Sequence, residues 1–341
     1  MKQITRILCI GLAVLGMTAC EKEETKNSVE VTGALVLNEG SYGVNNASIS
    51  ALDITTGDID NNWFSTANNR GLGNNGQDMV FYNGKVYATV TESNTLEAID
   101  PNTGASTQKS MGTLKPRSIA VDGGKLYISC YTPACVVRVD ASSLTIEDTC
   151  MLGEFKPEGI AIAQGKAFVS GAYNDSYQYD NKVYVIDLTA FESTSTIEVG
   201  CNLDKIEKIN DNKLLVAWTG NYDNIASGCA IIDANSLDVK TINHGLTKMA
   251  VYNGKAYGYH APYGGTTTWV AINSDGTTED FPFTVSIDNN AYGININPAN
   301  GDIYIMDADY SAGGNVYCFQ QDGTLRFKAE AGMNPSKVVF F

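Results

Sequence analysis

Basic and histidine side chains are scarce in this sequence of 341 residues. It contains 23 Lys and Arg against 38 Asp and Glu, and its formal net charge is −15. Proteins that bind nucleic acid need a basic surface, so we exclude nucleic acid as a partner. The only histidines are His244 and His260, and the motifs Gly-x-Ser-x-Gly and His-Glu-x-x-His are absent. We therefore expect no catalysis, no bound metal and no cofactor.

Long hydrophobic runs are missing too, with one exception near the N-terminus. Lys2 and Arg6 precede the apolar run ILCIGLAVLGMTA, which ends at Cys20. A basic start, a short apolar stretch and small residues before a cleavage point are typical of a secretory signal peptide, and the run is too short to span a membrane. The pattern predicts a signal peptide over residues 1–19.

The end of that run, MTAC, resembles a bacterial lipobox. The resemblance implies that Cys20 carries lipid and becomes the first residue of the mature chain, whereas an ordinary signal peptide with an incidental cysteine is the alternative. The next residues, CEKEETKNS, resemble the export signal of Bacteroidetes surface lipoproteins, although a plain solvated linker would also read this way. The implied location is the outer membrane, lipid-anchored and exposed at the cell surface, with residues 20–33 as an acidic lipidated linker.

Cysteine is limited to eight residues, and six of them remain besides Cys9 and Cys20. An even number in an exported protein permits disulfides, but the sequence does not choose between the pairings. Cys130 and Cys135 flank the four residues YTPA between two strand-like segments, so a bridge across this hairpin is geometrically reasonable. The alternative is that both are small buried hydrophobic residues.

A hairpin pattern recurs through the rest of the chain. MVFYNGKVYATV begins at Met79 and MAVYNGKAYGYH begins at Met249, and both place an Asn-Gly turn between two apolar segments. Related segments begin at Val121, Ile162, Ile209 and Asn297. Each joins two strand-like segments through a tight turn of Gly, Asn or Asp. The sequence therefore predicts a succession of antiparallel hairpins and no helix.

The spacing of these hairpins is typical of propeller blades. Counted at the first strand of each unit, the pattern recurs every 40 to 47 residues. A four-stranded unit of this length cannot bury its faces alone, so neighbouring units must pack around a ring. The last copy, PSKVVFF at the C-terminus, is a first strand only, whereas residues 34–67 supply strands two to four. We predict an all-β, seven-bladed β-propeller over residues 34–341, closed by pairing of the N- and C-terminal segments.

The repeats resemble those of the seven-bladed YncE-like propellers. The start LNEGSYGVNNASISALD, followed by GLGNNGQDM, is similar to the surface-lipoprotein propellers of Bacteroidetes in the DUF5074 group. Lipoproteins of this kind include the cobalamin-binding BtuG type, which hands its ligand to a TonB-dependent outer-membrane transporter. The resemblance implies a surface protein for nutrient capture, with cobalamin or another corrinoid as the leading ligand.

Tyrosine is concentrated in the loops that join second and third strands. In a propeller these loops lie on one face, where Tyr and Trp can bury a large flat area and keep a polar tip in water. The candidate ligand-binding residues are Tyr42, Tyr131, Tyr173, Tyr177, Tyr179, Trp218, Tyr222, Tyr259, His260, Tyr263 and Tyr310. We expect the loops of the fourth to sixth blades to form one off-centre aromatic patch. For any single tyrosine, packing against a neighbouring blade is the alternative.

The mouth of the central channel should be lined by the residues that begin the first strands. These candidates are Gln77, Arg117, Glu158, Lys205, Thr247, Tyr292 and Ser336. Their mixed charge suits a polar ligand or water, and a glycan or a peptide fits such a face as readily as a corrinoid does. Two other functions stay open, a protein-interaction scaffold and a lyase or hydrolase that would use His244 or His260.

Overall fold

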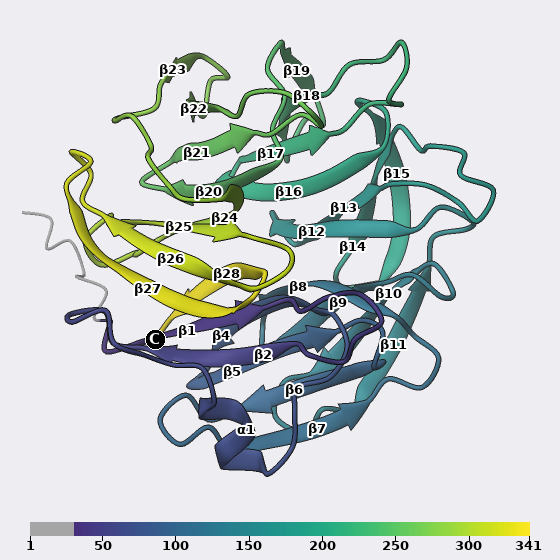
Figure 1. The fold of residues 1–341 in the computed structure, drawn as a ribbon. Coiled ribbons are helices and arrows are strands. Elements are labelled where there is room, and N and C mark those ends of the chain that lie inside the picture. The colour runs from purple at the N-terminus through teal and green to yellow at the C-terminus, as the bar shows by residue number, and fades with distance from the viewer. Residues whose placement is uncertain (1–30) are drawn as a thin grey trace, which may run out of the picture.

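The computed structural model describes residues 31–341, which form seven four-stranded antiparallel sheets. The predicted signal peptide, Cys20 and residues 20–30 of the predicted linker lie outside the described residues. The first strand of every sheet contacts the first strands of both neighbouring sheets, so the sheets close into a ring (Figure 1). The predicted seven-bladed β-propeller is thus confirmed. No helix in the described part of the chain is long and apolar enough to cross a membrane.

The blades are numbered 1 to 7 from the N-terminus, and each contributes four strands from the ring centre outwards. The inner strands, in blade order, are β28 (Pro335–Phe340), β4 (Gly76–Tyr82), β8 (Pro116–Asp122), β12 (Pro157–Ala163), β16 (Leu203–Asn210), β20 (Lys248–Tyr252) and β24 (Asn290–Ile296). The second strands are β1 (Ala34–Asn38), β5 (Lys85–Val90), β9 (Lys125–Cys130), β13 (Lys166–Gly171), β17 (Lys213–Trp218), β21 (Lys255–His260) and β25 (Ile303–Ala308).

The two outer positions of each blade follow the same order. The third strands are β2 (Ser48–Leu52), β6 (Thr95–Ile99), β10 (Cys135–Asp140), β14 (Lys182–Asp187), β18 (Gly228–Asp233), β22 (Thr268–Asn273) and β26 (Gly313–Phe319). The outer strands are β3 (Ile59–Asp60), β7 (Ser106–Ser110), β11 (Ile146–Met151), β15 (Glu192–Glu198), β19 (Val239–Ile242), β23 (Thr278–Asp280) and β27 (Leu325–Met333).

Blade 1 joins the two ends of the described chain. Its inner strand, β28, comes from the C-terminus, and its other three strands come from the N-terminal part. β28 and β1 are antiparallel, with Phe340 opposite Ala34 and Pro335 opposite Asn38, and Figure 1 shows yellow β28 next to purple β1. The predicted closure by the N- and C-terminal segments is therefore confirmed.

Apolar side chains fill the spaces between blades. Each buried cluster of the described chain draws on two neighbouring blades. Between blades 4 and 5, for example, Phe168 and Val185 pack in one cluster with Leu214 and Trp218. Because burial of apolar surface contributes about 25 cal/mol per Å², each blade depends on its neighbours for stability.

The repeated Asn-Gly pairs form the hairpin turns that the sequence predicts. Asn83 and Gly84 have φ angles of 49° and 76°, and Asn253 and Gly254 have 48° and 73°. Two successive positive φ angles are typical of a type I′ turn, which Asn and Gly adopt at low cost and whose twist matches that of the flanking strands. These turns join β4 to β5 and β20 to β21.

A β-bulge lies near the start of the inner strand in every blade except blade 6. At these points the pairing with the second strand passes over one or two residues. The bulged residues include Ser336, Gln77, Arg117, Glu158, Lys205 and Tyr292, all of them predicted to line the channel mouth. A bulge releases a residue from the regular ladder and redirects its side chain. In blade 6, β20 pairs with β21 without a bulge, from Lys248 opposite Tyr259 onward.

The prediction that no helix interrupts the strands was wrong at one place. Helix α1 (Trp63–Asn68) follows the two-residue strand β3, where a longer fourth strand was expected. Phe64 is buried in the core between blades 1 and 2, and Nδ2 of Asn68 donates a hydrogen bond of 2.8 Å to the carbonyl of Gly104. So short a helix depends on tertiary packing rather than on its own sequence, which explains why the pattern did not reveal it.

Candidate functional site

Two connected cavities occupy the centre of the ring. The wider one, which we call the tyrosine basin, has a volume of about 470 Å³, and the narrower one, the central channel, about 330 Å³. Both are lined in part by Glu39, Gln77, Lys205 and Lys248, so the basin opens into the channel. The predicted site residues that line the basin are Gln77, Arg117, Glu158, Lys205 and Tyr292 of the mouth and Tyr173, Tyr177, Tyr179 and Tyr222 of the loops.

The loop of blade 4 presents three of these tyrosines on a buried polar scaffold. The carboxylate of Asp180, which is only 3% exposed, accepts a hydrogen bond of 2.7 Å from the hydroxyl of Tyr184. Asn174, also buried, accepts bonds at its Oδ1 from the backbone N–H groups of Ser176 and Gln178. Buried side chains that satisfy backbone donors fix the path of a loop, so the tyrosines between them are held in place.

The loop of blade 5 uses the same device. Oδ1 of Asn221 accepts hydrogen bonds from the backbone N–H groups of Asp223, Asn224 and Ile225, at 2.8 to 3.1 Å. Tyr222 lies at the tip of this turn, and 76% of its surface is exposed. The asparagine thus orders the backbone around a tyrosine that remains available to solvent.

Two exposed basin tyrosines have an unusual backbone conformation. Tyr177 and Tyr222 have φ angles of 57° and 60°, and Tyr310 on the same face has 67°. Left-handed conformations are uncommon for bulky residues and cost free energy, so they persist where the surrounding structure imposes them and often mark functional positions. Tyr177 stacks on Tyr173 with ring centroids 5.8 Å apart, and Tyr179 meets Tyr222 edge-on at 6.3 Å. These two pairs line the same cavity, and we call them the tyrosine wall.

A charged network forms the wall beside these tyrosines. The guanidinium of Arg117 pairs with the Glu158 carboxylate at 2.8 Å and donates to Oε1 of Gln77 at 2.5 Å. The ring of Tyr131 lies 4.6 Å from Arg117, and its hydroxyl donates to Glu158. Burial alone would lower the pKa of Arg117, but the charge of Glu158 outweighs it and raises the pKa. Burial, with the same carboxylate, also raises the pKa of Tyr131. Arg117 stays cationic and Tyr131 stays neutral.

The floor of the basin carries further charges. Lys205 lies 3.5 Å from Asp204, and the hydroxyl of Tyr292 donates a hydrogen bond of 2.6 Å to Glu39. Burial acts to raise the pKa of Asp204, but the nearby lysines and Arg117 reverse this and lower it. Lys248 has a lowered pKa, first because of the charge of Lys205 and second because of burial. The floor therefore holds an ionised carboxylate beside a lysine whose charge is destabilised.

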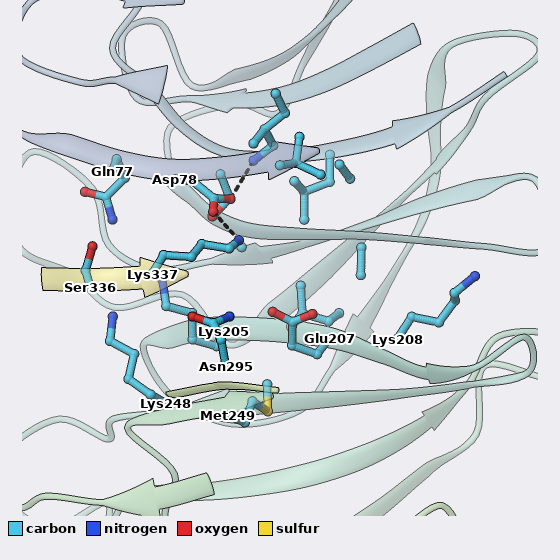
Figure 2. Close-up of a pocket in the computed structure, with 18 of the residues that line it drawn as sticks. Gln77, Asp78, Lys205, Glu207, Lys208, Lys248, Met249, Asn295, Ser336 and Lys337 are labelled. Carbon is cyan, nitrogen blue, oxygen red and sulfur yellow. Dashed lines mark hydrogen bonds and ion pairs between the residues drawn. The ribbon is translucent and has the colours of Figure 1, made fainter. Parts of the chain in front are cut away.

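The central channel, like the basin, is lined by both acidic and basic side chains. Figure 2 shows Asp78 of β4 paired with Lys337 of the neighbouring inner strand β28, and the Asp78 carboxylate also accepts a hydrogen bond of 2.9 Å from the backbone N–H of Ile119. Glu207 faces the same cavity, and burial raises its pKa. No three His, Cys, Asp or Glu side chains among residues 31–341 are arranged to hold a metal ion.

Two predicted platform residues are core residues instead. Trp218 is 7% exposed because its ring fills the space beside Gly200 and Gly228, where a side chain would collide with it. Its Nε1 donates to the carbonyl of Ala226 at 3.2 Å. Tyr259 is fully buried and packs 4.9 Å from the ring of Trp269. The prediction that both would be exposed to a ligand was wrong, because each lies on a strand position that points between blades.

The remaining aromatic candidates lie on the face but outside the basin. Tyr42 and Tyr263 are exposed, and Tyr310 packs edge-on against Tyr292 with ring centroids 5.8 Å apart. Nε2 of His260 lies 3.3 Å from Oγ of Ser227, and burial, together with nearby His244, lowers the pKa of His260. We expected one patch from blades 4 to 6, but the aromatic residues that line the basin come from blades 4 and 5 and, through Tyr292, from blade 7, and blade 6 adds none. Tyr131 of blade 3 packs edge-on against Tyr173.

The cysteine pair is not bridged in the structure. Cys130 and Cys135 are directly opposite each other on β9 and β10, fully buried, and both are free thiols. Their neighbours are the apolar side chains of the core between blades 2 and 3. The alternative, that they are small buried hydrophobic residues, describes them as they stand.

Three charged residues that line the basin were not predicted from the sequence. Glu39 and Asp204 line the basin, and Lys248 lines both cavities. Lys248 directly follows Thr247, which was taken as the mouth residue of blade 6. The missing bulge in β20 explains the error, because the other inner strands place a bulged residue at the mouth and blade 6 does not.

Comparison with known proteins agrees with this architecture. The family model described as "Domain of unknown function (DUF5074)" matches residues 32–334, which is most of the chain. The chain belongs to the DUF5074 family. No curated protein matches the sequence of this DUF5074 propeller.

Solved structures share the fold of the DUF5074 propeller at low sequence identity. A quinonprotein alcohol dehydrogenase-like protein from Bacteroides thetaiotaomicron is 16% identical, with a TM-score of 0.64 over 91% of this chain and 78% of that one. A 6-phosphogluconolactonase candidate from Bacteroides uniformis is 13% identical, with a TM-score of 0.64 over 92% and 100%. BamB from Moraxella catarrhalis is 13% identical, with a TM-score of 0.50 over 89% and 91%. At this level of identity the likeness shows a shared fold and no particular activity.

Proposed function

We propose that this DUF5074 propeller is a binding protein that captures a small ligand in the tyrosine basin. The observation that carries the proposal is the convergence of loop tyrosines and charged mouth residues on one cavity of about 470 Å³. Small-molecule sites commonly have volumes of roughly 300 to 1,000 Å³ and combine aromatic walls with a few fixed polar groups. Tyr177 and Tyr222 add exposed rings, and their backbone has a left-handed conformation, which supports a functional role.

The proposed ligand is cobalamin or another corrinoid. This choice comes from the resemblance of the chain to Bacteroidetes surface lipoproteins. A corrinoid is broad and bears amide side chains, which suits a wide hollow of phenol, amide and charged groups. It would lie across Tyr177 and Tyr222 with one edge in the basin. A glycan or a peptide is the alternative ligand class, because sugar rings also stack on tyrosine.

We further propose that the protein is lipid-anchored in the outer membrane and delivers its ligand to a TonB-dependent transporter. Most exposed large hydrophobic side chains of the described chain lie on loops of the basin face, namely Tyr42, Val44, Tyr177, Tyr222, Ile225, Tyr263 and Tyr310. Such a concentration of apolar surface suits contact with a partner protein. Replacing Cys20 with Ala should move the protein from the membrane fraction to the soluble fraction, and retention in the membrane would contradict the anchor.

Isothermal titration calorimetry of residues 28–341 with cyanocobalamin tests the ligand. We expect saturable heat of binding at micromolar protein. If no heat is measured, the corrinoid proposal is wrong, and a glycan array probed with the same protein then tests the alternative ligand class.

A further inference from the structure

Lys248 differs from the other cations of the site because it has no carboxylate partner. Each of the other cations that line the two cavities has a carboxylate partner. These ion pairs are Arg117 with Glu158, Lys205 with Asp204, Lys208 with Asp211, and Lys337 with Asp78. Lys248 lines both cavities and forms no ion pair with any residue in the part of the chain that the structure describes. A lysine held in a cavity without a counter-charge costs free energy unless something else neutralises it.

Two further donor groups line the same end of the channel. The Oγ of Ser336 is buried and has no hydrogen-bond partner among residues 31–341. Gln77 uses its Oε1 to accept from Arg117 and Asn75, which leaves its amide N–H groups for another acceptor. In Figure 2, Lys248 extends from β20 towards the end of the cavity that Ser336 and Gln77 also face. An ammonium, a hydroxyl and an amide therefore offer donors to one space.

We propose that Lys248, Ser336 and Gln77 form an anion subsite that holds a carboxylate or phosphate group of the ligand bound in the tyrosine basin. The inference rests on the proposed binding function and adds the chemical class of the ligand. Hydrogen bonds from a charged donor to an anionic oxygen are short and roughly twice as strong as neutral ones, so such a group would anchor one end of the ligand. The tyrosine wall would contact the rest.

The charges that face Lys248 favour an incoming anion. The positive charge of Lys205 on β16 repels the ammonium of Lys248 and lowers the pKa of Lys248, and burial is the second cause. The carboxylates of Asp204, Glu39 and Glu158 offset this lowering only in part. A bound anion would relieve the repulsion between the two lysines. It would also raise the pKa of Lys248, because a nearby opposite charge favours the protonated form. Affinity for the anion should therefore fall as the pH rises through the lowered pKa of the lysine.

Competitive acetylation with acetic anhydride, quantified by mass spectrometry of Lys248 peptides, tests the subsite on the unmodified protein. The probes are inorganic phosphate and acetate, and exposed Lys85 on the hairpin of blade 2 is the internal control. We expect phosphate or acetate to slow acetylation of Lys248 by about tenfold and to leave acetylation of Lys85 unchanged. A hydrogen bond to a charged group is commonly strong enough to account for a roughly tenfold change. Protection by phosphate alone assigns a phosphate ester, and protection by acetate alone assigns a carboxylate. If neither probe protects Lys248 selectively, the subsite is wrong.

Variants separate this inference from the proposed function. We expect phosphate or acetate to raise the melting temperature of the unmodified protein. Lys248→Gln should abolish this increase, whereas Lys85→Gln should retain it. Removing Tyr177 and Tyr222 together should leave protection of Lys248 by the small anions intact, because those rings contribute to the wall and not to the anion subsite. Loss of cyanocobalamin binding in the tyrosine variant with intact anion protection would support both proposals. An anion effect that survives Lys248→Gln would overturn the subsite alone.

Discussion

Blades 4 and 6 both carry several tyrosines in their second strand or in the loop that follows it, yet they use these aromatic residues differently. In blade 4 the strand β13 ends at Gly171, so Tyr173, Tyr177 and Tyr179 belong to the loop and face the basin. In blade 6 the strand β21 continues through Tyr259, which is paired with Trp269 on β22. Where the strand ends therefore decides whether a tyrosine is presented to a ligand or packed between blades.

The packing in blade 6 is an aromatic cluster rather than a surface. Trp269 packs against Tyr259 at 4.9 Å and against Phe281 at 5.2 Å, and Phe281 continues to Phe283 at 5.1 Å. The outer strand of this blade, β23, has only three residues, so side chains replace the area that a longer strand would cover. Blade 4 has a seven-residue outer strand, β15, so its loop tyrosines are not needed to cover the blade and can line the basin.

The largest effect is expected from removing the buried tyrosine of blade 6. Tyr259→Ala should lower the free energy of unfolding by about 3 to 5 kcal/mol, because it leaves a large cavity beside Trp269. Tyr263→Ala, in the loop of the same blade, should change it by no more than about 0.5 kcal/mol, because Tyr263 is fully exposed. Urea denaturation of both variants gives the comparison, and equal losses would contradict the different roles.

A second substitution sharpens the same point. The hydroxyl of Tyr259 is buried and has no hydrogen-bond partner among residues 31–341. Tyr259→Phe should therefore be stabilising or neutral within about 1 kcal/mol, because the buried hydroxyl gains nothing for its desolvation. A clear loss of stability in the same denaturation experiment would show that the hydroxyl has a role the packing does not reveal.

The effect on ligand binding should follow the opposite pattern. Replacing both Tyr177 and Tyr222 with Ala should weaken binding of the basin ligand by about thirtyfold, or about 2 kcal/mol, while stability stays nearly unchanged. Tyr263→Ala is the matched control, because it removes the same side chain from the same face outside the basin, and its affinity should equal that of the unmodified protein. Calorimetric titration measures both, and a weaker Tyr263→Ala complex would extend the site to blade 6.

The smallest effect concerns His260 of blade 6. Its pKa in the folded protein is lowered by burial and by His244, whereas a histidine in the unfolded chain has a pKa of about 6.5. The unfolded chain then binds more protons below about pH 6.5, so this contribution to stability is present above that pH and is lost as the pH falls through the folded value. Between pH 7 and pH 5 the free energy of unfolding should fall less in His260→Gln than in the unmodified protein. The difference should be no more than about 0.5 kcal/mol, because solvent screens the partly exposed ring. Urea midpoints across this range check it.

The sequence predicted the ring well and the basin in part. Periodic hairpins and Asn-Gly turns are local signals, so the blade number, the closure and the mouth residues at the starts of the inner strands could be read directly. Four of the loop tyrosines line the basin as expected. Trp218 and Tyr259 were misplaced because the ends of β17 and β21 depend on packing with neighbouring strands. Lys248 was missed because the lack of a bulge in β20 moves the mouth position by one residue without a clear mark in the sequence. Glu39 was missed because it lies just after β1 and not on an inner strand.

The position of β28 also fixes the order of events when the chain is made. The strand that completes blade 1 consists of Pro335–Phe340, so it is synthesised after every other strand of the propeller, while its partner β1 is synthesised before all of them. Until those final residues emerge, the edge of β1 that will pair with β28 stays open, and open edges invite pairing with other chains. The ring cannot close before β28 has been made, so a nascent chain, or one truncated before Pro335, needs protection from aggregation while the other strands of the propeller are synthesised.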